Sequence, residues 1–388
     1  MDVAIVVQHY PPYLAGAELQ AQVLARVLAA HCGRCDVITT RYESSLPSRS
    51  EDGAVRILRL STLGRGNLRS CVNFVTGFLC LLARGGKYGA IHAKCLSPFS
   101  LGAILGAKLR GCGTILTVCC TGENGDIPTV KEHRLGRFLW WGFMKTDIFV
   151  AQTPVQVEYV MEQGIPKGRV ETVPNMLQTV PSGLPSPASR AGARAKLRVP
   201  DRPTVLFVGR LIPEKGLAEL QSAWNQVRLK HDATLMIVGE GPEEATLASW
   251  AAGSKGLSDS VRLLGRQVPV DACYCASDIL ILPSHSEAFG NVVAEAMSYG
   301  LAVITTPVGL AQVWIENGRN GLVVDGSTQS LVDATRVLLA DADFSSRLGE
   351  AAHHDALDLF APTQVLPYYL DLYKRVSGRN KEAKPGYA

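Results

Sequence analysis

Apolar runs of strand length alternate with helical segments over most of this sequence, and that alternation restricts the fold more than any other feature. In the first part, strands are predicted at residues 3–7, 36–40, 55–60, 91–93, 114–118, 148–150 and 168–173, and helices at 17–30, 100–109 and 154–163. Strands separated by helices usually pair in parallel, with helices on both faces of the sheet. The pattern therefore predicts an α/β domain with a doubly wound, Rossmann-like sheet.

The same alternation restarts near residue 204, which predicts a second unit of the same kind. Its strands are predicted at residues 204–208, 233–238, 261–264, 278–282, 302–305 and 321–324. The stretch before it is rich in Pro, Ser, Ala and Arg without an apolar period, as is typical of a linker. Because 388 residues exceed the size of one core, we predict domains at 1–180 and 204–365, a linker region at 181–203, and a C-terminal helix with a loose tail at 366–388. The two doubly wound domains are expected to face each other across a cleft.

The composition excludes several classes of protein. With 47% hydrophobic and 19% charged residues, the sequence is that of a soluble globular protein. The apolar run at residues 3–7 is too short for a signal peptide or a membrane span, so a cytoplasmic location is expected. Ten cysteines without a regular framework favour reduced thiols. Cys32 and Cys35 have the spacing of a zinc or redox pair, but no second pair follows at ligand spacing, and no metal or cofactor is predicted.

Charge is distributed unevenly along the chain. Residues 1–180 contain 19 Lys and Arg against 13 Asp and Glu, and this basic half suits an anionic partner such as a phospholipid surface or a phosphorylated acceptor. Nucleic acid is not predicted, because no basic cluster is interleaved with aromatic residues. The apolar run at 71–83 has basic residues on both sides and is too short to span a bilayer. It is compatible with an interfacial helix on an anionic membrane and with a buried core helix.

Two glutamates, Glu287 and Glu295, stand eight residues apart where the strand predicted at 278–282 leads to a helix predicted at 291–299. Open α/β sheets bind ligands outside the carboxyl ends of their strands, and the N–H groups at a helix start attract phosphate. The segment therefore offers two carboxylates that can accept hydrogen bonds from sugar hydroxyls, together with an anion site. Taken alone, both glutamates are also compatible with ordinary solvated positions.

A second loop carries two cations after a predicted strand of the same domain. Arg210 and Lys215 lie five residues apart on the loop that follows residues 204–208. The planar guanidinium of arginine binds phosphate oxygens in pairs, and lysine adds a point charge. Surface exposure is the commoner fate of such residues, but two loops of complementary chemistry in one domain favour a site for a sugar diphosphate.

Three segments together resemble a known family. The loop GRLIPEKG (209–216), the segment SEAFGNVVAEAMSYG (286–300) and the turn TPVG (306–309) look like those of the retaining glycosyltransferases of family 4, which have the GT-B fold and an E-x7-E motif. The resemblance covers nearly the whole chain. It implies a metal-independent enzyme that moves a hexosyl-type sugar from a nucleoside-diphosphate sugar, UDP- or GDP-linked, to a hydroxyl of a saccharide, lipid-linked or small-molecule acceptor. The first domain would then bind the acceptor and the second the nucleotide sugar.

The resemblance also assigns roles to residues. Arg210 and Lys215 match the cations that hold the donor diphosphate, Glu287 matches the acid near the donor sugar, and Glu295 matches the acid at the ribose. Arg210, Lys215 and Glu287 are then the catalytic residues. Further donor contacts would come from Phe289, Gly290, Asn291 and Val292, and from Gly16 in a glycine-rich loop of the first domain.

Two positions depart from the family pattern. Ala17 stands where a second glycine of the glycine-rich loop is usual, and the larger departure follows the strand predicted at 114–118. Many relatives place a histidine after the strand that corresponds to 114–118, whereas this chain has Cys119 there. Glu123 and Asp126, on the same loop, are candidates on the acceptor side, although a polar loop without function is an equal alternative. In the family mechanism the leaving diphosphate accepts the proton of the acceptor, so a missing histidine does not exclude activity.

Two other functions were compared with this one. A nicotinamide-dependent oxidoreductase would carry Gly-x-Gly-x-x-Gly after its first strand, and neither glycine loop has that spacing. A non-catalytic sugar-nucleotide-binding accessory subunit is the remaining alternative, and retention of every donor-side residue argues against it.

Overall fold

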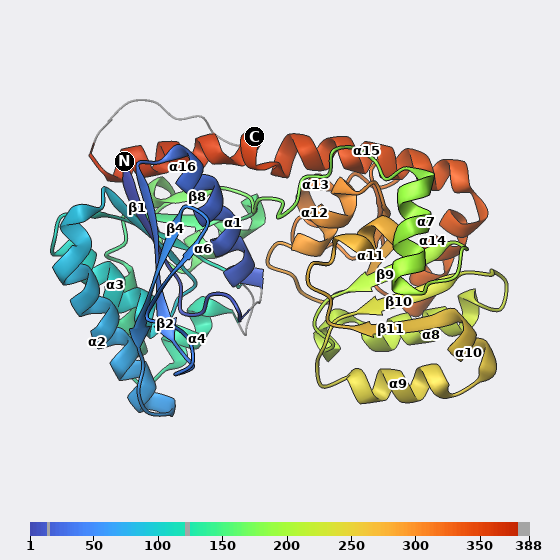
Figure 1. Cartoon of the computed structure of the whole chain (residues 1–388), viewed down its shortest axis with the longest axis horizontal. Coiled ribbons are helices and arrows are strands. Elements are labelled where there is room, and N and C mark those ends of the chain that lie inside the picture. The colour runs from blue at the N-terminus through green and yellow to red at the C-terminus, as the bar shows by residue number, and fades with distance from the viewer. Residues whose placement is uncertain (14–15, 121–124, 379–388) are drawn as a thin grey trace. The chain divides into compact units, whose positions relative to one another are not determined.

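The computed structural model describes residues 1–13, 16–120 and 125–378 (Figure 1). It divides into two compact units, which we call unit 1 (Met1–Gln178 with Pro362–Ala388) and unit 2 (Thr179–Ala361). Each unit has its own sheet with helices packed on both faces. The prediction of two doubly wound α/β domains is therefore confirmed.

Within the described residues, the sheet of unit 1 has eight strands, with the first strand near its middle. In spatial order they are β3 (Arg49–Asp52), β4 (Val55–Ser61), β2 (Arg34–Arg41), β1 (Asp2–Val6), β5 (Ala90–Lys94), β6 (Gly113–Thr117), β7 (Ile148–Ala151) and β8 (Val170–Thr172). All neighbours pair in parallel except β3 and β4. The chain winds from β1 to one edge and then from β5 to the other, so the winding direction changes between β1 and β5.

The helices of unit 1 cover both faces of this sheet. They are α1 (Gly16–His31), α2 (Gly66–Arg84), η1 (Gly85–Lys87), α3 (Pro98–Lys108), α4 (Asp126–Glu132), α5 (Gly136–Phe143), α6 (Pro154–Glu162), η2 (Lys167–Arg169) and α16 (Pro362–Val376). In β1 the side chains alternate: Val3 and Ile5 pack in one hydrophobic cluster with α1 and α16, and Ala4 and Val6 in another with α3. Burial on both faces is what makes the strand a continuous apolar run.

The C-terminal helix α16 completes unit 1 although it lies far away in the sequence. The buried His92 on β5 hydrogen-bonds Tyr373 of α16, with 2.8 Å between Nδ1 and the hydroxyl oxygen. Arg375 donates to Glu171 at 2.6 Å. A C-terminal helix was predicted at this place, and from residue 379 onward the predicted loose tail lies outside the described residues.

Helix α2 packs on α3 through glycines. A Cβ at Gly102 would lie 2.0 Å from the carbonyl oxygen of Phe74, so the two helix backbones touch there. The helical segment Gly66–Lys87 is long and apolar enough to cross a membrane by length and composition, and only 17% of its apolar window is buried inside the protein. The buried core helix that the sequence allowed is therefore not what α2 forms.

The sheet of unit 2 has six strands and repeats the winding of unit 1. In spatial order they are β11 (Val261–Gly265), β10 (Thr234–Val238), β9 (Thr204–Val208), β12 (Ile279–Leu282), β13 (Ala302–Thr305) and β14 (Leu322–Val323). All neighbours pair in parallel. The winding direction changes between β9 and β12, and ligands of open α/β sheets bind at such a point, outside the carboxyl ends of the strands.

Unit 2 has a matching set of helices. They are α7 (Pro187–Leu197), η3 (Pro213–Lys215), α8 (Leu217–Val227), α9 (Glu244–Ala252), α10 (Lys255–Ser260), α11 (Asp271–Ala276), α12 (Asn291–Ser298), α13 (Ala311–Trp314), α14 (Thr328–Ala340) and α15 (Ala342–Phe360). Helices α8 and α14 pack together, as do α12 and α15. The short helix α12 begins directly at the carboxyl edge of the sheet, and its first turn is part of the candidate site.

The predicted linker differs from the structure, because residues 187–197 form the helix α7 within unit 2. Charged groups attach this helix in place of an apolar stripe: Arg194 donates to Asp278 at 2.8 Å, and Arg190 lies 3.0 Å from the same carboxylate. A sequence signal for the helix was present, since Ser186 caps its start and Pro187 occupies the first helical position.

Candidate active site

The candidate site of unit 2 lies at the carboxyl ends of β9 and β12, where the winding direction changes. The loop after β9 contains Lys215, and the loop after β12 contains Glu287. The Nζ atom of Lys215 donates a hydrogen bond to Oε1 of Glu287 at 2.6 Å. The two side chains are only 15% and 14% exposed. Ser284 donates to the same oxygen at 2.9 Å. Two predicted residues from separate motifs are thus brought together.

Close backbone contacts hold these loops in position. Gly216 has a left-handed φ of 68°, and a Cβ there would lie 2.1 Å from the carbonyl oxygen of Pro283. His285 N–H donates to the carbonyl of Glu214 at 2.9 Å. The lysine loop therefore lies directly against the end of β12, which explains why Lys215 reaches Glu287.

A third loop, the one after β13, packs on the same site. Gly309 has φ of 57°, and a Cβ there would lie 2.5 Å from the carbonyl oxygen of Phe289 and 3.1 Å from Cβ of Glu287. Thr306 donates its hydroxyl to the carbonyl of Ser284 at 2.5 Å. The three sequence segments that resembled one family are therefore neighbours in space.

Sequence reasoning missed a fourth loop, which follows β10. A Cβ at Gly239 would lie 1.8 Å from the carbonyl oxygen of Gly209, and one at Gly241 would lie 2.4 Å from that of Leu211. Leu211 N–H also donates to Glu240 at 2.9 Å. The available signal was the Gly-x-Gly directly after a predicted strand, which requires a close backbone neighbour. This loop fixes the path of the segment that carries Arg210.

The start of α12 offers backbone N–H groups at this edge. Gly290 is its N-cap residue with φ of 87°, and no side chain caps the helix there. Asn291 and Val292 form the first turn and are half-buried. Phe289 is buried and packs edge-on against Phe360, with 5.5 Å between ring centroids. Its backbone carbonyl accepts a hydrogen bond from Leu310 N–H at 2.7 Å, in the loop after β13. An uncapped helix start suits an anion such as a phosphate.

Glu295 has different partners from Glu287. The hydroxyl of Tyr274 on α11 donates to Oε2 of Glu295 at 2.7 Å, and Tyr299 donates to Asp271 at 2.7 Å. The two tyrosine rings stack with 5.5 Å between centroids. Burial raises the pKa of Glu295 to about 7, against the hydrogen bond from Tyr274, and the charge of Asp271 raises it further. The two glutamates are therefore not a hydrogen-bonded acid–base couple.

Arg210 follows β9 and Gly209, with an exposed side chain. Its backbone is fixed on both sides, because Gly209 N–H donates to the carbonyl of Val238 at 3.0 Å and Leu211 N–H to that of Glu240 at 2.9 Å. Arg210 thus supplies an exposed cation, whereas Lys215 supplies one that is held by Glu287. Together they can neutralise the two charges of a diphosphate.

The acceptor-side candidates lie in unit 1, at the carboxyl ends of β5 and β6. Asp126 at the start of α4 accepts hydrogen bonds from the backbone N–H groups of Cys119 at 2.8 Å and Cys120 at 3.2 Å. Burial raises the pKa of Asp126, and these backbone bonds oppose that shift. Glu123 lies outside the described residues, and Gly16 is the first residue of α1.

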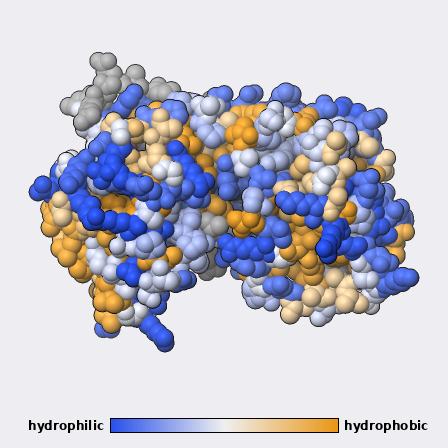
Figure 2. Space-filling view, in the orientation of Figure 1, coloured by the Kyte–Doolittle hydropathy of each residue, from blue (hydrophilic) through white to orange (hydrophobic). Residues whose placement is uncertain are grey.

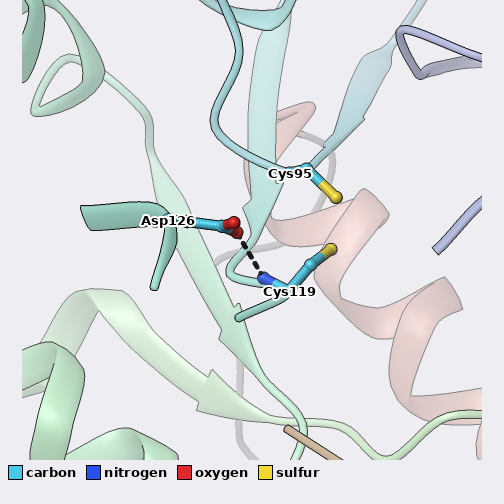
Figure 3. A group of neighbouring side chains, drawn as sticks. All are labelled: Cys95, Cys119 and Asp126. Atoms are coloured by element: carbon cyan, nitrogen blue, oxygen red, sulfur yellow. Dashed lines mark hydrogen bonds between the residues drawn. The ribbon is translucent and has the colours of Figure 1, made fainter. Parts of the chain in front are cut away.

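Cys95, which was not predicted, completes this group (Figure 3). The ligand atoms of Cys95, Cys119 and Asp126 all lie within 4.8 Å of one another. Cys95 has a left-handed φ of 64°, which is uncommon for a residue with a side chain. The hydrogen bond to Cys119 and burial raise the pKa of the Cys95 thiol.

Comparison with known proteins identifies the family. The model described as "Glycosyl transferase 4-like domain" matches residues 15–176, and that of "Glycosyl transferases group 1" matches residues 202–341. The chain is 30% identical over 252 residues to the lipopolysaccharide core biosynthesis glycosyltransferase LpsE of Rhizobium meliloti, covering 64% of this chain and 67% of the relative. It is 34% identical over 192 residues to a GDP-mannose-dependent alpha-(1-6)-phosphatidylinositol monomannoside mannosyltransferase of Mycobacterium tuberculosis, covering 45% and 50%.

The fold has a clear counterpart among solved structures. Sucrose-phosphate synthase from Thermosynechococcus elongatus superposes with a TM-score of 0.78 at 22% identity. The superposition covers 98% of this chain and 100% of the synthase chain. Two doubly wound units of this kind form the GT-B fold. The chain belongs to the family that combines a glycosyl transferase 4-like domain with a glycosyl transferases group 1 domain.

Proposed function

We propose that this protein transfers a hexosyl-type sugar from a UDP- or GDP-linked donor to a hydroxyl group, with retention of the anomeric configuration. The observation that carries the proposal is the Lys215–Glu287 pair at the winding reversal of unit 2, joined there by the uncapped start of α12. A cation, a carboxylate and the start of a helix without a side-chain cap, all at one edge, match a diphosphate and the hydroxyls of a sugar.

The binding roles follow from the partners that each residue has. The donor diphosphate lies at Lys215, Arg210 and the first turn of α12, where positive charge and N–H groups coincide. Glu287 accepts hydrogen bonds from the hydroxyls of the transferred sugar, and its bond from Lys215 fixes the position of its carboxylate. Glu295 accepts from the ribose, with Tyr274 fixing the position of its carboxylate.

The reaction needs charge stabilisation more than a protein base. The bond between the anomeric carbon and the phosphate oxygen breaks, and the bond to the acceptor oxygen forms on the same face. The acceptor proton passes to the departing phosphate oxygen. Lys215 and Arg210 stabilise the charge that develops on this diphosphate, which is where preorganised cations lower a barrier most. No metal has a role in this scheme.

The acceptor is proposed to be a lipid-linked saccharide bound by unit 1. The names of the two relatives refer to a lipopolysaccharide core and to a phosphatidylinositol monomannoside. The chain spans about half to two thirds of those relatives, so their particular acceptors are not transferred to it. Asp126 and Cys119, at the carboxyl edge of unit 1, are the residues proposed to meet the acceptor.

The outer face of α2 supports contact with an anionic membrane. Leu68, Val75 and Leu79 on this face are 63%, 47% and 55% exposed, and Figure 2 shows hydrophobic surface along the edge that α2 forms. Arg65 and Arg84 lie at the helix ends. An apolar helix face with basic flanks binds the interface of anionic lipids.

Co-sedimentation with vesicles that contain anionic lipid tests this contact. The wild-type protein should sediment with the vesicles, and the variant Val75→Glu/Leu79→Glu should remain in solution. Equal binding of both proteins would remove α2 from the proposal.

A thermal-shift panel of UDP-, GDP- and ADP-sugars tests the donor, because a ligand at 100 times its Kd adds ~2.7 kcal/mol of stability. With the stabilising donor and a lipid-linked saccharide, release of nucleoside diphosphate and NMR of the product test transfer and retention. Binding without any release, across a full acceptor panel, would favour the accessory subunit instead. An inverted anomeric centre would refute retention.

A further inference from the structure

Two cysteines from neighbouring strand ends of unit 1 form a close pair. Cys95 follows β5 directly, and Cys119 is two residues beyond the end of β6. Lys94 and Thr117 are partners in the parallel ladder, so the two cysteines are offset by one residue across adjacent strands. Their sulfur atoms lie within 4.8 Å of each other, and both are free thiols. Adjacent strands lie about 4.8 Å apart, a separation that disulfides span.

The backbone holds both thiols in place. Cys95 N–H donates to the carbonyl of Thr117 at 3.2 Å, which ties the end of one strand to the next. Asp126 accepts from the N–H of Cys119 at 2.8 Å. In Figure 3 the two thiols extend to the same side, whereas Asp126 reaches the backbone of Cys119 from the other side. The carboxylate therefore positions Cys119 and leaves its sulfur directed toward Cys95.

The backbone of Cys95 is left-handed, which is a second observation about this pair of cysteines. A φ of 64° is unfavourable for a side chain that has a Cβ, and such residues persist where the surroundings require them. Here it occurs at the junction of β5 and α3, where only residues 95–97 connect the strand to the helix. The short connection sets the direction of the thiol.

We propose that Cys95 and Cys119 form a reversible disulfide when the protein meets a small-molecule disulfide such as oxidised glutathione. One thiolate attacks the oxidant, giving a mixed disulfide and one molecule of reduced glutathione. The second thiol, on losing its proton, attacks the mixed disulfide and releases another. The protein loses two hydrogens, and the two electrons are transferred to the oxidant.

The bond would join the loops after β5 and β6 at the carboxyl edge of unit 1. It closes a ring of chain that contains α3, and it fixes Cys119 to a neighbour at the edge proposed for the acceptor. Restricting that edge is expected to slow transfer. This effect on rate rests on the proposed function, whereas formation of the bond does not.

The covalent test uses the full chain and needs no activity. Reduced protein is incubated with oxidised glutathione, alkylated under denaturing conditions and digested without reductant. We expect a linked peptide pair containing Cys95 and Cys119, with neither of these two thiols alkylated. The control Cys120→Ser should keep the link, and Cys95→Ser should lose it. Full alkylation of both cysteines, under conditions that oxidise the exposed Cys71, would overturn the proposal, as would a link through Cys120.

A second measurement separates a disulfide from a metal site. If added Zn²⁺ protects both thiols from alkylation while glutathione never links them, the group with Asp126 is a metal site and the disulfide is wrong. Where transfer is measurable, oxidation should lower it at least threefold, and dithiothreitol should restore it in the wild type. Cys95→Ser, compared with its own reduced state, should not respond to oxidation; an equal loss in that variant would refute the link to function.

Discussion

The carboxyl edges of the two units share a topology but differ in how their loops are fixed. In unit 2, Gly216, Gly239 and Gly309 each meet a backbone oxygen of a neighbouring loop, and an ion pair closes the centre. In unit 1, the described loops of the same edge are joined by hydrogen bonds, among them those from Cys119 N–H to Asp126, from Cys95 N–H to the carbonyl of Thr117 and from Thr40 to the carbonyl of Gln8. A diphosphate and ribose are common to many donors and require one fixed arrangement, whereas acceptors vary. The comparison therefore predicts large effects on chemistry in unit 2 and smaller effects on acceptor use in unit 1.

The largest effect is expected for Lys215→Ala. Its loss removes a preorganised cation from the leaving diphosphate and leaves Glu287 without its cationic partner, so kcat should fall by about 10²–10³. Steady-state kinetics with the identified donor measure this. The control is Lys230→Ala, which removes an exposed lysine of the same unit. Equal kcat values for the two variants would exclude Lys215 from catalysis.

A comparable but structural effect is expected for Gly216→Ala. The added Cβ would collide with the carbonyl oxygen of Pro283 and occupy a left-handed backbone, at a cost of ~1–3 kcal/mol. Donor affinity should fall with stability, because the loop carries Lys215. Gly318→Ala is the matched control: φ is 82°, but nothing lies within 4 Å of the new Cβ. Identical losses of donor affinity in both variants would mean that the loop contact is unimportant.

The next effect concerns Glu295→Gln, for which we expect about tenfold weaker nucleotide binding, equivalent to one hydrogen bond to a charged group. The pKa of Glu295 in the folded protein is about 7, above its usual 4.5, so the folded state binds more protons between these values. Its contribution to stability is therefore present at low pH and lost as pH rises toward 7. Calorimetry from pH 5 to 8 should show the wild-type Tm falling relative to the variant; parallel curves would contradict the raised pKa.

Much of this fold could be predicted from the sequence, because buried strands of parallel sheets are continuous apolar runs. The edge strand β3 was missed because its four residues are all polar and form no apolar run. Lys215 and Glu287 were found because each follows such a run, and the structure places them 2.6 Å apart. The partnership of Glu295 with Tyr274 depends on how α11 packs on α12, which one sequence does not show. Helix α7 was missed because charges attach it.

The smallest expected effect tests the other side of the comparison. Asp126→Asn keeps an oxygen that can accept from Cys119 N–H but removes the carboxylate charge at the edge proposed for the acceptor. We expect the KM for the acceptor to rise by up to about tenfold, with donor affinity unchanged, because hydrogen bonds to charged groups contribute ~1.5–3 kcal/mol and an amide retains part of this.

Asp147→Asn is the control that separates this role from a loss of stability. Asp147 also accepts from a backbone N–H of unit 1, that of Thr114 at 2.9 Å, but Thr114 is the second residue of β6 and lies at the amino end of the sheet. Both variants lose a charged hydrogen-bond acceptor, so both should lower Tm. Since ligands bind at the carboxyl ends of the strands, only Asp126→Asn should change the acceptor KM. If both variants change the acceptor KM equally, the carboxyl edge of unit 1 has no specific role in acceptor binding. The assignment of the acceptor to this edge would then be wrong.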